Sequence, residues 1–301
     1  MENNAKTKWK TLLFSLWTPA VYMVVQVVVG FLIALPVLVS AMSKMMKESN
    51  PLQFDVNEYI QRLYSSPEMM NALMVLTALS GILMTVYMVF YYRKKKKISY
   101  NSLGITDIKP KSAIIGALLG IGSMSTVVMV LNIIYQFFDI GITDETMELV
   151  SMASPIWAMV ATVAVAPIVE EFIFRGFMFE RLSRVFSPRM TIFLTALVFG
   201  LIHMNLIQSS YAFVIGLVFG YFRAKYEDLW GCILFHIFAN FFGSFDFSYF
   251  GVLVPFAVYM SGIVIFIGTM IFMLVDKEKG LLKKKEKKAI ETVVIIEETN
   301  G

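Results

Sequence analysis

The sequence has little charge and almost no cysteine. Only 16% of its 301 residues are charged, whereas a soluble domain of this size has about a quarter. Its single cysteine, Cys232, has no partner in the chain, so an internal disulfide is excluded and the redox compartment stays open. We find no internal repeat and no Gly/Ser-rich linker, and a single domain is therefore expected.

Apolar residues are abundant and fall in long blocks. They make up 57% of the chain, and the mean hydropathy is +0.70. A bilayer-crossing helix needs roughly 20 consecutive apolar residues, and helices satisfy their own backbone polar groups in lipid. The first block is too long for a signal-peptide core, so we expect it to be a retained span. The sequence predicts an all-α, polytopic transmembrane helix bundle of about eight spans, at 12–42, 69–92, 113–138, 155–172, 190–204, 210–225, 229–245 and 250–275.

The distribution of basic residues predicts the orientation of these spans. All but three of the 26 Lys and Arg residues fall in segments that share one side when the N-terminus is inside. The exceptions are Lys44, Lys47 and Arg62, and the loop at 139–154 is acidic. Because basic loops stay in the cytoplasm, both termini are predicted to be cytoplasmic. The run from Arg93 to Lys97 is then a topology signal beside the membrane, and a nucleic-acid partner is not expected.

Ionisable residues inside apolar spans are costly and usually mark function. The chain has only two histidines, His203 and His236, and both lie in apolar runs. Asn240 follows His236 by four residues, so the two share a helix face. Glu170 and Glu171 close another apolar run. These residues are the strongest functional signal in the sequence.

The two glutamates are expected to have different roles. Glu171 and Arg175 are four residues apart and can form an ion pair within a helix. Glu170 is rotated by about 100° from Glu171, so it can face the site instead. Pro167 precedes Glu170 by three residues and can kink the helix there.

Two chemistries suit this set of side chains. A carboxylate and an imidazole can take a proton from water, while a second imidazole and an amide stabilise the oxyanion of a tetrahedral intermediate. Alternatively, Glu170, His203 and His236 could hold Zn²⁺ with a water as the fourth ligand. The HExxH helix of soluble zinc proteases and the G-x-S-x-G elbow of serine hydrolases are both absent. The residues themselves do not decide between direct and metal-assisted activation of water.

Three motifs in these runs resemble one known family. Glu170–Gly176 is similar to the EExxxR motif of the CAAX prenyl protease and bacteriocin-processing (Abi, CPBP) family of intramembrane metalloproteases. Phe199–His203 resembles its FxxxH motif, and His236–Asn240 resembles its HxxxN motif. The three occur in the family's order and cover about 155–245, less than a third of the chain.

The resemblance implies roles for single residues. Glu170 and His203 would activate water, His236 and Asn240 would stabilise the oxyanion, and Glu171 and Arg175 would shape the site. Residues 1–276 would form a transmembrane peptidase domain, and 277–301 would form a charged cytoplasmic tail. The family also implies a membrane-associated peptide or protein as substrate, and the composition favours a bacterial plasma membrane.

Two other function classes remain open. A non-catalytic membrane protein, such as a binding scaffold or a bacteriocin-immunity factor, could keep the same residues. A transporter could use Glu170 and the histidines as a proton relay, although the chain lacks the internal repeat typical of transporters.

The predicted spans place His203 too far from Glu170 and His236 for the three to meet. We expect the site in a cavity below the cytoplasmic surface, because Glu170 and His236 lie towards that side. His203, however, lies about 21 Å from the cytoplasmic start of its span if the helix is straight. Convergence therefore requires the Glu170 helix to run on past Arg175, or the helix before His203 to tilt or to start lower.

Overall fold

The computed structural model describes residues 2–47, 55, 57–59, 66–96, 98–137, 153–245, 247, 251, 253–278 and 280–281. The protein is an all-α, polytopic transmembrane helix bundle, and the described residues contain no strand. Outside the glutamate-bearing helix, the helices are α1 (Glu2–Lys47), α3 (Pro67–Lys96), α4 (Tyr100–Leu103), α5 (Pro110–Phe137), α10 (Pro188–Leu201), α11 (Leu206–Tyr226), α12 (Leu229–Ser244) and α13 (Leu253–Val275).

Every apolar block predicted from the sequence is a helix. Among the described residues, six helices are long and apolar enough to cross a membrane. The other two, α10 and α12, have 14 and 16 residues, so they rise only about 21 and 24 Å. The acidic loop at 139–154 lies almost wholly outside the described residues. The same is true of the tail at 277–301, apart from a few residues after Asp276.

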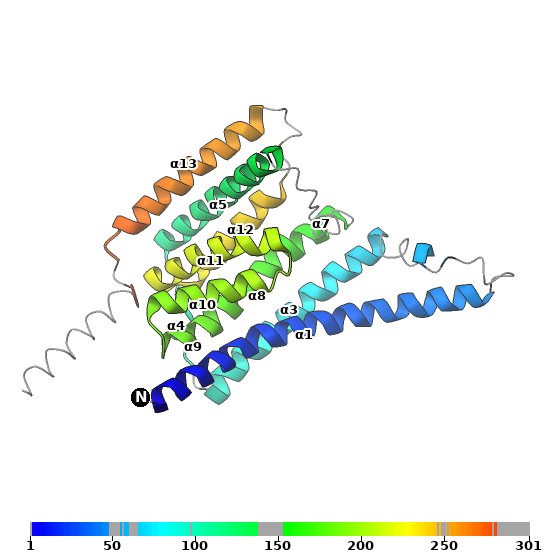
Figure 1. Ribbon diagram of the computed structural model, residues 1–301, viewed down its shortest axis with the longest axis horizontal. Helices are drawn as coiled ribbons and strands as arrows, with labels where there is room; N and C mark the ends of the chain where they lie inside the picture. The colour runs from blue at the N-terminus through cyan, green and yellow to red at the C-terminus, as the bar shows by residue number, and fades with distance from the viewer. Residues whose placement is uncertain are drawn as a thin grey trace, which may run out of the picture.

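The helices α12, α5 and α13 pack side by side (Figure 1). Glycines allow α5 to approach α12 closely. A Cβ atom added to Gly116 or Gly120 would lie 2.3 Å from a backbone carbonyl oxygen of α12. Small residues at helix contacts are how membrane helices gain van der Waals packing without a hydrophobic driving force. The backbone of α12 is therefore held against α5 over the turns that lead to His236.

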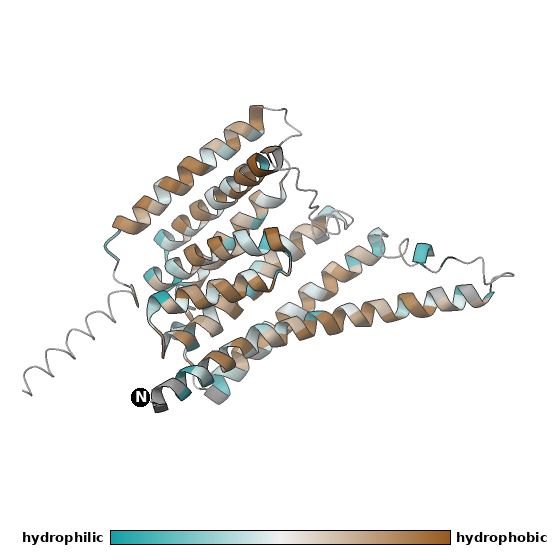
Figure 2. Ribbon diagram, viewed as in Figure 1, coloured by the Kyte–Doolittle hydropathy of each residue, from teal (hydrophilic) through white to brown (hydrophobic). Residues whose placement is uncertain are grey.

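The pair α1 and α3 flanks the other side of the bundle (Figure 1). Many of its apolar side chains are exposed, as in Leu83 at 68% and Val27 at 68%, and the hydropathy colouring shows long apolar stretches on both helices (Figure 2). Exposed apolar surface of this extent suits lipid contact. Inside the pair, the hydroxyls of Thr18 and Tyr92 share a hydrogen bond of 3.2 Å.

One end of the bundle gathers the basic segments, and we call it the basic end. It comprises the start of α1 and the segments 93–96, 98–111, 181–189, 223–229 and 276–278, and several side chains link these segments. Lys109 donates to the Tyr226 carbonyl at 2.9 Å, and Lys111 forms an ion pair of 2.7 Å with Asp276. The clustering agrees with the predicted common side of these segments, and their cytoplasmic location stays a prediction.

Caps fix where the short helices begin. Asp228 caps α12 by accepting hydrogen bonds from the N–H groups of Trp230 and Gly231, and it also accepts from the Ser112 hydroxyl of α5. Ser187 caps α10, with Pro188 at the first helical position. Both α10 and α12 therefore start at the basic end and stop well short of the opposite end.

Candidate active site

A single helix from Pro155 to Ser183 carries both glutamates. Its parts are α7 (Pro155–Ala158), the π-helical η2 (Met159–Val165), α8 (Ala166–Glu171), the π-helical η3 (Phe172–Met178) and α9 (Phe179–Ser183). The sequence-based end of this span at residue 172 is wrong. The helix continues because Arg175, which resembles a loop residue in the sequence, is fully buried against Glu171.

This longer helix removes the difficulty over depth. Glu170 now lies 13 residues from the helix end at Ser183, about 20 Å along the axis. His203 lies a similar distance from the start of α10. The first of the two arrangements required for convergence, a Glu170 helix that runs on past Arg175, is therefore the one observed.

Pro167 and Asn240 are linked through the backbone of η2. In a π-helix each carbonyl accepts from the N–H five residues later, as the Ala166 N–H does with the Ala161 carbonyl. The Thr162 carbonyl would need the N–H of Pro167, which proline lacks. Asn240 supplies the missing donor, since its Nδ2 donates to the Thr162 carbonyl at 2.8 Å. This bond fixes the Asn240 amide beside α8.

Glu171 joins two parts of the site. Its Oε1 accepts from Nη1 of Arg175 at 3.0 Å and lies 2.9 Å from Nδ1 of His236. A carboxylate only accepts, so Nδ1 of His236 carries the hydrogen and donates it. In neutral His236 the lone pair is then on Nε2. Glu171 thus sets both the orientation and the tautomer of the ring.

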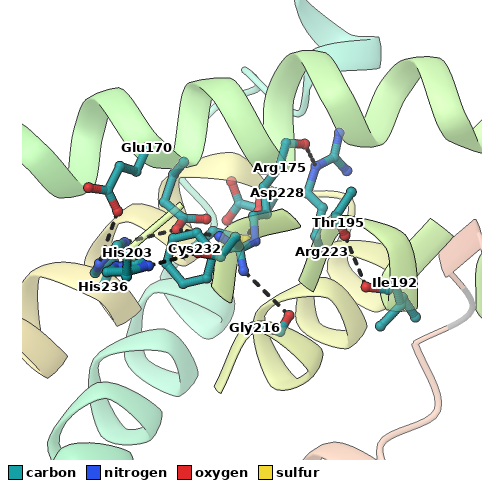
Figure 3. Close-up of polar contacts among 12 residues, drawn as sticks. Glu170, Arg175, Ile192, Thr195, His203, Gly216, Arg223, Asp228, Cys232 and His236 are labelled. Atoms are coloured by element: carbon teal, nitrogen blue, oxygen red, sulfur yellow. Dashed lines mark hydrogen bonds and ion pairs between the residues drawn. The ribbon is translucent and has the colours of Figure 1, made fainter. Parts of the chain in front are cut away.

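Arg175 lies next to this network, on the side of the basic end. Its guanidinium lies over the rings of Phe199 and Phe219, at 4.3 and 4.5 Å from their centroids, and Nη2 donates to the Gly216 carbonyl at 3.4 Å. Cation–π contacts gain strength when the groups are desolvated, as here. Figure 3 shows Arg175 further along the helix than Glu170, between the histidines and Arg223.

Glu170 points into the open part of the site. Its Oε2 lies 3.9 Å from Nε2 of His236, and its side chain remains 15% exposed. This separation is too long for a direct hydrogen bond. With neutral His236, both facing atoms are acceptors, so a direct contact between them is unfavourable and each needs its own donor from water or substrate.

His203 lies just beyond the end of α10. Its Nδ1 is 2.8 Å from the Phe199 carbonyl, which can only accept, so Nδ1 donates. Its Nε2 is then the free basic atom of the neutral ring. The two histidine rings both pack edge-on against the Phe199 ring, with centroids at 5.1 and 5.8 Å.

The four predicted catalytic residues line one cavity of about 210 Å³. Figure 3 shows Glu170, His203 and His236 turned towards one another. Sequence reasoning missed the Thr162 carbonyl and Phe219, which carried no signal because apolar and hydroxyl residues are common in spans. The remaining lining residues are Met124, Ala166, Phe199, Gln208, Tyr211, Ala212, Ile215, Ala239, Gly243 and Ser244.

The three predicted zinc ligands, Glu170, His203 and His236, line the same cavity. Both histidines present Nε2 as the free atom, which is the tautomer a metal would need. Within the described ranges, however, no three His, Cys, Asp or Glu side chains converge closely enough to hold a metal ion. The residues therefore do not fit a three-ligand zinc site as they stand.

The comparisons agree with the motif-bearing segment. A family model described as type II CAAX prenyl endopeptidase Rce1-like matches residues 152–242, the segment that holds Glu170, His203, His236 and Asn240. Searches of curated proteins and of solved structures found no match to the chain.

Proposed function

We propose that the protein is an intramembrane endopeptidase that uses Glu170 to activate water, because the segment that carries the four site residues matches the Rce1-like model of CAAX-type proteases. The match supports a multi-pass membrane protease. The proposal adds the residues, the water and the substrate class. The observation that carries the proposal is that Glu170 lines the cavity and faces Nε2 of His236 at 3.9 Å, with its side chain 15% exposed.

The hydrolytic step follows from the free atoms of the cavity. Glu170 takes a proton from water as the oxygen attacks the peptide carbonyl carbon. The free Nε2 of His203 accepts the second hydrogen of that water and orients its lone pair.

The oxyanion needs hydrogen-bond donors of its own. Asn240 has two amide hydrogens and uses one on the Thr162 carbonyl, which leaves the other for the oxyanion. In its protonated form His236 would supply a second donor from Nε2, since its Nδ1 already donates to Glu171. The C–N bond then breaks, and Glu170 returns its proton to the leaving amine.

The proposed substrate is a membrane-associated peptide or protein in a bacterial plasma membrane. The cavity walls are mostly apolar, with Phe199, Ile215 and Phe219 beside the four polar side chains. Such walls favour a peptide whose residues around the cleaved bond are apolar. Zinc assistance would need the ligands to move closer together, so no step is assigned to it.

The test is cleavage by the purified protein in lipid nanodiscs. Membrane-anchored reporter peptides are incubated with the wild type, with Glu170→Gln and with Glu180→Gln. Glu180 lies on the same helix but pairs with Arg184 at the basic end, so its variant is a matched control. We expect Glu170→Gln to lose about 10²–10⁴-fold in cleavage rate and Glu180→Gln to keep it.

A Glu170→Gln variant that cleaves as fast as the wild type would contradict the proposal. A chelator arm separates the two ways of activating water, since loss of cleavage on chelation and its return with Zn²⁺ would favour the metal. The non-catalytic alternative predicts that an in vivo immunity or binding phenotype survives Glu170→Gln.

A further inference from the structure

The cavity extends from the middle of the bundle towards the end opposite the basic end. Its lining includes Gln208 near the start of α11 and Gly243 and Ser244 at the end of α12. These positions lie about 20–27 Å along their helices from the basic end. The cavity therefore extends well past the region below the cytoplasmic surface in which the sequence predicts the site.

The short helices explain why the cavity opens there. From the basic end, α10 and α12 rise about 21 and 24 Å, whereas α5, with 28 residues, rises about 42 Å. The helix Pro155–Ser183 packs on α10 and α11 through η3, near the basic end. The part of this helix that lies farther from the basic end holds Thr162 and Glu170 and lines the cavity.

The path from the basic end is filled. Below the histidines, the side chains of Arg175, Phe174 and Phe177 are 0% exposed. Phe222 and Phe235 are equally buried in the cluster that joins α5, α11 and α12. Arg223 adds a polar seal, because its Nε donates to the Arg175 carbonyl at 3.1 Å and its Nη2 to the Ser102 carbonyl at 3.0 Å.

The rim of the cavity is apolar where α10 joins α11. Leu201, Met204 and Leu206 there are 63%, 79% and 77% exposed. Three large apolar side chains at one connection are suited to lipid contact rather than to water. A substrate that reaches the cavity past this rim would itself be held in the membrane.

From these observations we infer that the cavity takes its substrate from the extracytoplasmic side of the membrane. The basic end carries most of the described Lys and Arg residues, and basic segments remain in the cytoplasm, so the mouth at Gln208 and Ser244 faces outwards. The substrate class is an exported or outward-facing membrane-anchored peptide, cut within the membrane. This substrate class rests on the proposed function, whereas the side of access does not.

Cysteine labelling of intact cells tests the side of access. Cys232 is the chain's only cysteine and is buried, so Cys232→Ser provides the background. Ser244→Cys reports the mouth, and Asn101→Cys, on an exposed residue of α4, reports the basic end. We expect a membrane-impermeant maleimide to label Ser244→Cys fully in intact cells and Asn101→Cys only after permeabilisation.

Labelling of Ser244→Cys only after permeabilisation would overturn the inference. Absence of labelling in both states would overturn it too, because the mouth would then not reach water. Gln208→Cys serves as a second mouth position if Ser244→Cys does not fold. If the mouth is labelled from outside but no reporter is cleaved, the proposed function fails and the side of access stands.

Discussion

Polar side chains are paired at the basic end of the bundle, whereas several in the part that holds the cavity, here called the cavity half, are left open. At the basic end, lysines and arginines bind carbonyls and carboxylates, as Lys225 does with the Asp276 carbonyl at 2.7 Å. In the cavity half, Glu170 and Nε2 of His203 face open space. Glu171 belongs to both patterns, since it is fully buried and paired but holds His236 in position. The difference separates groups that stabilise the fold from groups available to react.

The largest effect on stability is expected at Arg175, which lies between the basic end and the cavity. Arg175→Met would leave Glu171 buried without its cation, at a cost of about 3–5 kcal/mol. The matched change, Arg184→Met, removes an exposed i,i+4 pair with Glu180, worth less than about 1 kcal/mol. Thermal unfolding in one detergent should show a large drop for Arg175→Met alone. Equal drops for the two variants would mean that the buried Arg175–Glu171 pair contributes no more to stability than the exposed Arg184–Glu180 pair does.

A smaller effect is expected where the cavity wall meets Pro167. Asn240→Ala leaves the Thr162 carbonyl without its donor, costing about 1–3 kcal/mol of stability, and removes a proposed oxyanion donor worth about 10²–10³-fold in rate. Pro167→Ala restores a backbone N–H that can reach this carbonyl. A double-mutant cycle should therefore show that Pro167→Ala recovers stability in Asn240→Ala but not cleavage.

Two outcomes of that cycle would count against the account. Full recovery of cleavage would reduce Asn240 to a structural residue. Additive losses of stability would show that Pro167 and Asn240 do not share the Thr162 carbonyl.

The smallest effect is expected at the basic end itself. The hydrogen bond from Lys111 holds the pKa of Asp276 below its ordinary value, with the Tyr226 hydroxyl assisting. A lowered folded-state pKa stabilises the protein above the unfolded pKa, and this gain is lost as the pH falls through the folded value. Asp276→Asn should therefore lower the free energy of unfolding at pH 7 by less than about 1 kcal/mol, and with it the melting temperature.

The difference between Asp276→Asn and the wild type should shrink below about pH 4. Melting curves from pH 7 to pH 3 in the same detergent measure it. A difference that grows as the pH falls would contradict the assigned cause.

The sequence predicted the helices well because lipid imposes a simple rule on length and hydropathy. Each apolar block is a helix, and the motif residues line one cavity. The end of the span at residue 172 was wrong because Arg175 looks like a loop charge unless its burial against Glu171 and two aromatic rings is known. The ion pair between the two residues was visible in the i,i+4 spacing, but its depth was not.

Other features depend on contacts between distant segments. The bond from Asn240 to the Thr162 carbonyl joins residues 78 positions apart and follows from a π-helical segment that no pattern of apolar residues predicts. The side on which the cavity opens depends on the relative lengths of α10, α12 and their neighbours. Span boundaries read from the sequence, uncertain by a few residues, do not fix such differences.

The most direct test of the account is a structure of the Glu170→Gln variant in a lipid nanodisc with an uncleaved substrate peptide bound. The account predicts the scissile carbonyl in the cavity, within hydrogen-bond reach of the Asn240 amide and His236. The side chain at position 170 and His203 should flank one water beside it. A peptide bound elsewhere, with its cleaved bond more than about 10 Å from position 170 and thus beyond the reach of one bridging water, would contradict the account.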